Sequence, residues 1–134
     1  MIHAHMAREI DEAILAHGQW KARLAAAVRD GQADISSQVA TREDRCAFGA
    51  WLNGPSFAPE VRSLVEFQKV RALHALFHQA AGRVVSYVEQ GKADVALALL
   101  RGEFTQRSEE LVSALREWKT SATTQAVRQA ASGW

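Results

Sequence analysis

The sequence predicts an all-α protein that folds as a four-helix bundle, with three long helices and one short helix that carries the only cysteine. Three observations predict this class. Long stretches rich in alanine, leucine, arginine and glutamate favour helix. Apolar residues recur in them at three- and four-residue steps. Both prolines and the main turn signals are confined to a few short segments, and no segment shows the alternation of a strand.

The first long helix is predicted over residues 4–29, and Asp30-Gly31 ends it. Residues 32–40 have no clear period and are predicted to form a loop. The helix carries one apolar stripe that includes a histidine: Ile10, Ile14, His17, Leu24 and Val28.

A short helix is predicted next. Thr41 resembles an N-cap, because Asp44 follows it three positions later. This helix should pass through Cys46 and Trp51. The run Asn53-Gly54-Pro55 should stop it, with glycine just past the end and proline after it.

Two more long helices complete the prediction, one from Pro59 to about residue 90 and one over residues 93–118. Gly91 separates them. We predict that residues 1–120 form a single helical domain, to which the metal site described below belongs. Residues 121–134 are a C-terminal tail that either frays or extends the last helix, because they are small and polar with little period.

Composition limits the function classes. The chain has 134 residues, of which 48% are hydrophobic and 23% charged, as in ordinary globular domains. Its 16 basic and 15 acidic residues leave a net charge of +1, so no strong field of one sign exists. We therefore expect neither nucleic acid nor a membrane as a partner.

Cysteine usage and the N-terminus favour a cytoplasmic location. A single cysteine forms no internal disulfide and suits a reducing compartment. The first residues lack the basic start, apolar run and cleavage site of a signal peptide. The longest apolar stretches are far shorter than a membrane span.

Three histidines lie where apolar residues are expected. His74 and His78 are four apart on one predicted helix and therefore share a face. His17 lies in the stripe of the first helix. Each one alone can be read as a hydrogen-bonded core histidine, because a buried imidazole needs either hydrogen-bond partners or a metal. Cys46 alone can be read as a small buried apolar residue.

Together these four residues form a plausible tetrahedral zinc site with one thiolate and three imidazoles. Copper(I) is a chemical alternative. A carboxylate or carbonyl should hold the imidazole N–H groups, and the candidate residues are Glu12, Glu43 and Asp44. Trp20 and Trp51 either shield the metal from water or simply pack in the core.

Three sequence blocks resemble the chemoreceptor zinc-binding (CZB) domain family, over about residues 10–118. The blocks are His17-Gly18-Gln19-Trp20, Cys46-Ala47-Phe48-Gly49-Ala50-Trp51 and His74-Ala75-Leu76-Phe77-His78. The resemblance implies a helical bundle, commonly homodimeric, that binds zinc through His17, Cys46, His74 and His78. Members of this family are fused to chemoreceptors and to diguanylate cyclases, where they are implicated in sensing zinc or oxidants such as hypochlorous acid.

The resemblance thus implies a sensory domain that acts in signal transduction, such as chemotaxis, through a signalling partner. The alternative is a structural zinc module that serves as a dimerisation or docking scaffold. We do not expect an enzyme, because four protein ligands leave no open position on zinc. Ala75 also stands where a metalloprotease places its glutamate. The chain carries no receptor signalling hairpin and no cyclase domain, so its effector is expected to be another polypeptide or a part outside this sequence.

Overall fold

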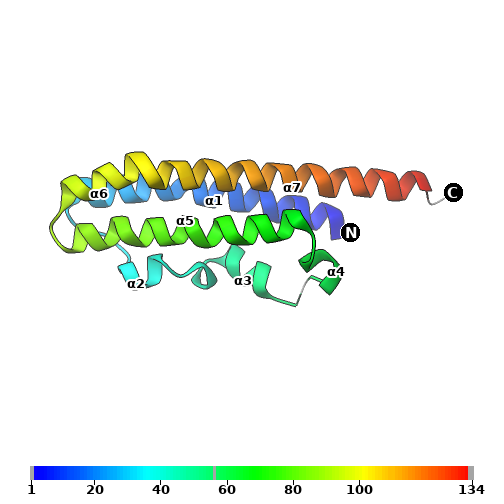
Figure 1. Ribbon diagram of the computed structural model, residues 1–134, viewed down its shortest axis with the longest axis horizontal. Coiled ribbons are helices and arrows are strands. Elements are labelled where there is room, and N and C mark those ends of the chain that lie inside the picture. The colour runs from blue at the N-terminus through cyan, green and yellow to red at the C-terminus, as the bar shows by residue number, and fades with distance from the viewer. Residues whose placement is uncertain (1, 56, 133–134) are drawn as a thin grey trace.

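The computed structural model describes residues 2–55 and 57–132, and every regular element in these ranges is helical. This confirms the all-α prediction. Three long helices contact one another along the molecule: α1 (Ile2–Asp30), α5 (Val65–Glu89) and α7 (Thr105–Ser132). Figure 1 shows that α1 and α5 run in the same direction and α7 in the opposite one. No helix among the described residues is long and apolar enough to cross a membrane.

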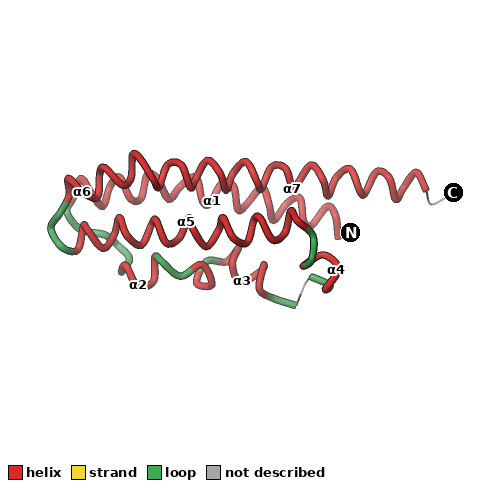
Figure 2. Tube along the Cα trace, in the orientation of Figure 1, coloured by secondary structure: helices red, strands yellow, loops and turns green. Residues whose placement is uncertain are grey.

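The fourth position of the predicted bundle holds a chain of short elements instead of one helix. These elements return along α5 between the end of α1 and the start of α5, and short loops join them (Figure 2). They are α2 (Ser37–Ala40), the 3-10 helix η1 (Glu43–Arg45), α3 (Ala47–Asn53) and α4 (Pro59–Arg62).

The loop predicted over residues 32–40 is corrected by α2. The hydroxyl oxygen of Ser36 accepts a hydrogen bond from the backbone N–H of Val39 at 3.2 Å and so caps this single turn. A helix of four residues is too short to show a period in the sequence, and this is why the pattern indicated a loop.

The short helix predicted through Cys46 is also corrected. Thr41 ends α2 instead of beginning a helix, and Cys46 is itself the N-cap of α3, with extended angles of φ −86° and ψ 140°. The backbone therefore turns at the cysteine between η1 and α3. The backbone angles at this turn set the direction of the thiol, because Cys46 lies outside both helices.

The long helix predicted from Pro59 is interrupted. Pro59 begins α4, as its fixed φ favours at a first helical position. Leu64 is then extended, with ψ 143°, and caps α5. The helix predicted over residues 93–118 is in fact α6 (Ala93–Leu99), a π-helical turn η2 (Leu100–Phe104) and α7, whose backbone stays helical to Ser132.

The core lies between the long helices and the short elements, and both contribute buried residues to it. The chain turns at two glycines, Gly31 after α1 with φ 71° and Gly91 after α5 with φ 74°. Both have left-handed backbone angles, which glycine adopts without strain. Among residues whose side chains the structure describes, the buried set is otherwise apolar and includes three polar members, His17, His74 and His78.

Candidate metal centre

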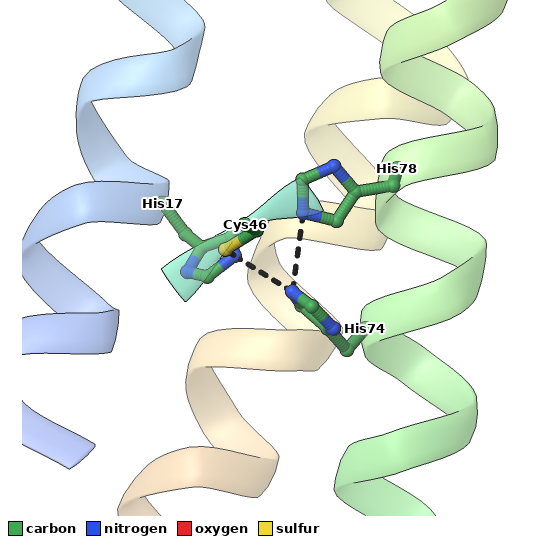
Figure 3. Close-up of side chains that lie close together, drawn as sticks. All are labelled: His17, Cys46, His74 and His78. Atoms are coloured by element: carbon green, nitrogen blue, oxygen red, sulfur yellow. Dashed lines mark hydrogen bonds between the residues drawn. The ribbon is translucent and has the colours of Figure 1, made fainter. Parts of the chain in front are cut away.

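The four residues predicted from the sequence meet at one point in the bundle. His17 comes from α1, His74 and His78 from one face of α5, and Cys46 from the turn before α3 (Figure 3). One donor atom from each residue lies within 4.8 Å of all the others. The structure therefore brings together side chains from three segments that are far apart in the sequence.

The spacings suit a small tetrahedral ion. The Nε2 atom of His74 lies 3.1 Å from Nε2 of His17 and 3.1 Å from Nε2 of His78. The sulfur of Cys46 lies 3.7 Å from Nε2 of His17. A regular zinc tetrahedron with usual bond lengths has edges of about 3.4 Å between nitrogens and about 3.6 Å between nitrogen and sulfur.

The hydrogen bonds of the outer ring nitrogens define which atoms face the centre. Nδ1 of His17 lies 2.7 Å from the carbonyl oxygen of Ala13, and Nδ1 of His78 lies 3.1 Å from that of Ala40. Carbonyl oxygens only accept, so each Nδ1 carries the proton and each Nε2 presents a lone pair. His74 could donate at most one proton to these two lone pairs. A thiol on Cys46, 3.7 Å from Nε2 of His17, could donate a second proton. One cation in place of these protons would be bound by all four donor atoms at once.

The family comparison agrees with this donor set. The model of the chemoreceptor zinc-binding domain, CZB, matches residues 17–85, half of the chain, and this range contains all four residues. The chain belongs to this family. Neither a curated protein nor a solved structure shows a significant match to it.

Chemoreceptor zinc-binding domains bind zinc, and the centre of this member fits that ion in size and in donor type. The matched range is narrower than residues 10–118, over which the sequence blocks indicated a resemblance. It ends within α5, so α6, η2 and α7 lie outside it.

Burial keeps the imidazoles of this zinc-binding domain neutral. His17, His74 and His78 are each 1% exposed. The pKa of His17 is lowered to about 4 and that of His74 to about 2, mainly because burial removes the rings from water and in smaller part because other histidines lie close by. Burial also lowers the pKa of His78. Neutral imidazole is the form that ligates metal, so these three rings need no deprotonation at neutral pH.

Aromatic rings surround the donor imidazoles of the centre. Phe77 lies 5.0 Å from the ring of His17, Phe48 lies 5.2 Å from His74, and Trp20 lies 5.6 Å from His78, each edge to face. Of the two tryptophans predicted as possible covers, Trp20 touches a donor ring. Trp51 instead packs against other aromatic rings and reaches the centre only through Phe48.

Phe48 and Phe77 were not predicted as walls of the centre. The available signals were their positions, because Phe48 follows Cys46 by two residues and Phe77 directly precedes His78. Both residues are buried, and both also fit ordinary core packing. Only the fold shows that their rings contact donor rings.

Backbone carbonyls hold the outer N–H groups of His17 and His78, in place of the acidic side chains considered from the sequence. The side chain of Glu12 is exposed, and Asp44 pairs with Arg42 at 2.7 Å. The backbone carbonyl of Glu43 accepts a hydrogen bond from the backbone N–H of Cys46 at 3.3 Å. A Cβ on Gly49 would lie 1.8 Å from the carbonyl oxygen of Glu43 and 3.1 Å from Cε1 of His74, so only glycine lets α3 pack this closely beside the centre.

Proposed function

We propose that the chain is a regulatory zinc-binding domain in which His17, Cys46, His74 and His78 hold one zinc ion. In this proposal the domain responds to zinc or to oxidants and acts on a signalling protein such as a chemoreceptor or a diguanylate cyclase. The observation that carries the proposal is the asymmetry of the donor set. Three donors are buried imidazoles, whereas Cys46 is partly exposed and belongs to a short segment.

A regulatory role fits this donor set better than catalysis does. Four protein donors complete a tetrahedron and leave no position for water or substrate. The aromatic walls around the histidines leave little room for a further ligand. We therefore propose that the domain is not an enzyme.

The partly exposed thiolate is the chemical basis of the proposed oxidant response. The thiolate sulfur of Cys46 attacks the chlorine of hypochlorous acid, so that a sulfenyl chloride forms, the sulfur is oxidised by two electrons and hydroxide leaves. Hydroxide then displaces chloride from the sulfur, so that the net products are a sulfenic acid and one chloride ion. The oxidised sulfur is a poorer metal donor than thiolate. The segment that holds Cys46 then loses one of its links to α1 and α5.

A row of aromatic contacts connects that segment to α7. Trp51 lies on α3, five residues after Cys46, and its ring is 6.0 Å from that of Trp118 on α7. Phe57 fills the space beside both rings, at 4.7 Å and 5.9 Å. Figure 1 shows α7 continuing past the start of α1. We propose that a change at Cys46 reaches α7 through the packing of Trp51 on Trp118.

The proposal includes a homodimer, as the family implies. The exposure of apolar side chains on one end of α5 supports an interface there, since Val65 is 77% exposed and Leu64 is 36% exposed. Sedimentation of the purified chain measures its oligomeric state directly. A monomer at all concentrations would remove this part of the proposal.

Metal exchange distinguishes a sensor from a scaffold. The chain is purified without added metal, its zinc content is measured, and zinc is then titrated in competition with a chromophoric chelator. Zinc that exchanges within minutes at regulatory concentrations supports the sensor. One zinc per chain that survives chelators until the protein unfolds supports the structural module instead.

A further inference from the structure

The short helix α2 contributes no donor atom to the centre, yet it lies against α5 beside it. Ala40, the last residue of α2, is buried. Its carbonyl oxygen is the hydrogen-bond partner of Nδ1 of His78, at 3.1 Å. This bond links α2 to a proposed zinc ligand through one backbone atom.

Both ends of α2 are fixed. At its start, the hydroxyl of Ser36 caps the turn, and a carboxylate oxygen of Glu89 accepts a hydrogen bond from the backbone N–H of Ser37 at 3.3 Å. Glu89 lies near the end of α5, so this contact anchors the start of α2 to the same helix that carries His78. The far end of α2 is anchored by packing.

That packing depends on a glycine. Gly82 is buried on α5, four residues after His78. A Cβ at this position would lie 2.6 Å from Cβ of Thr41, 3.0 Å from its Cα and 3.1 Å from its backbone nitrogen. The backbone directly after Ala40 therefore rests on α5 where a side chain is missing. Gly18, next to His17 on α1, has open space around the same position.

We propose that Gly82 and α2 position His78 for zinc. The missing side chain of Gly82 lets Thr41 rest on α5, and this contact places the Ala40 carbonyl against Nδ1 of His78. The carbonyl keeps the proton on Nδ1 and leaves the lone pair on Nε2. The inference rests on the proposed four-residue zinc site, and Gly82 acts in it only through His78.

The consequence is specific to one ring atom. If α2 moves away, Nδ1 of His78 loses its acceptor and nothing favours that tautomer. A proton on Nε2 would then occupy the position that faces the metal. His17 is independent of α2, because its acceptor is the Ala13 carbonyl on its own helix. The effect of displacing α2 should therefore be confined to His78.

The test compares Gly82→Ala with Gly18→Ala, a matched control on a helix beside another ligand. Zinc affinity is measured by chelator competition, and the histidine tautomers of the metal-free protein are read from long-range proton–nitrogen correlation spectra. Gly82→Ala should bind zinc ten- to a hundredfold more weakly, as changes to ligand partners do. It should also shift His78 towards the Nε2–H tautomer. Gly18→Ala should match the native chain in both measurements.

Two further variants separate positioning from general damage. Ser36→Ala weakens α2 without touching α5, and it should reduce zinc affinity several-fold with the same change at His78. Adding Thr41→Gly to Gly82→Ala removes the 2.6 Å contact and should recover part of the affinity. If Gly82→Ala does not fold, Ser36→Ala alone decides the question.

The inference is overturned if Gly82→Ala or Ser36→Ala keeps the native tautomer of His78, whatever happens to affinity. It is also overturned if both variants bind zinc as the native chain does. Failure of the zinc site itself is recognised separately. In that case the native chain binds no zinc, while the tautomer spectra of the metal-free protein still report whether α2 positions His78.

Discussion

His17 and His74 bring their Nε2 atoms to within 3.1 Å of each other although 57 positions separate them in the sequence. One side chain comes from α1 and the other from α5, and their rings meet edge to face. Nε2 of His74 can donate one proton to Nε2 of His17 across this distance. In the proposed centre one zinc ion takes the place of this proton and joins the two helices.

Loss of one imidazole should weaken zinc binding strongly. We expect His74→Ala to raise the dissociation constant at least about a hundredfold, the upper end of what loss of a ligand's own partner costs. His5→Ala is the matched control, because His5 is exposed on α1. Chelator competition measures both variants. One zinc per chain with native affinity in His74→Ala would remove this residue from the site.

The metal-free domain should lose stability in mild acid. The pKa of His17 is lowered to about 4 and that of His74 to about 2, both from 6.5. Below pH 6.5 the unfolded chain therefore binds more protons than the folded one. Stability is fully present above pH 6.5 and falls as the pH drops towards 4. The urea midpoint of the zinc-free chain should be lower at pH 5 than at pH 7.5. This difference between the two midpoints should be smaller in His74→Leu. An equal or higher midpoint at pH 5 contradicts this account.

Hypochlorite should release zinc through Cys46. One equivalent added to the zinc-loaded native chain should free metal, which a chromophoric indicator detects. Cys46→Ser retains every methionine and tryptophan, so it controls for oxidation elsewhere. We expect it to release no additional zinc after oxidant. Equal release from both chains would show that the thiolate is not the responsive group.

Zinc removal should increase hydrogen exchange in α7. Hydrogen exchange should speed up in α3 and around Trp118 when the metal is chelated, because Trp51 connects the two elements. In Trp51→Leu the α3 response should remain and the α7 response should shrink. An α7 response of native size in Trp51→Leu would rule out this aromatic contact as the connection.

The long helices and the three histidines could be predicted because both leave a periodic signal, whereas Cys46 was predicted as the only cysteine. An apolar stripe with a histidine in it specifies a face, and His74 and His78 share that face by helical geometry alone. The packing of α1 on α5 then brings His17 to the other two histidines. Side-chain pattern was sufficient for this much of the structure.

The short elements could not be predicted in the same way. Cys46 caps α3 instead of lying inside a helix, because its orientation depends on one backbone angle that leaves no trace in apolar spacing. The contact of the Ala40 carbonyl with His78 could not be predicted either, because every residue has a backbone carbonyl. The break at Leu64 is hidden because the apolar pattern continues across it. Backbone atoms decide these features, and only the fold shows them.

The central claim is that one sulfur and three imidazole nitrogens bind a single zinc ion. X-ray absorption at the zinc edge of the native chain tests it most directly. The account predicts one sulfur at about 2.3 Å and three nitrogens at about 2.0 Å, with the sulfur signal lost in Cys46→Ser. A shell of oxygens or a sulfur-free spectrum in the native chain would contradict it.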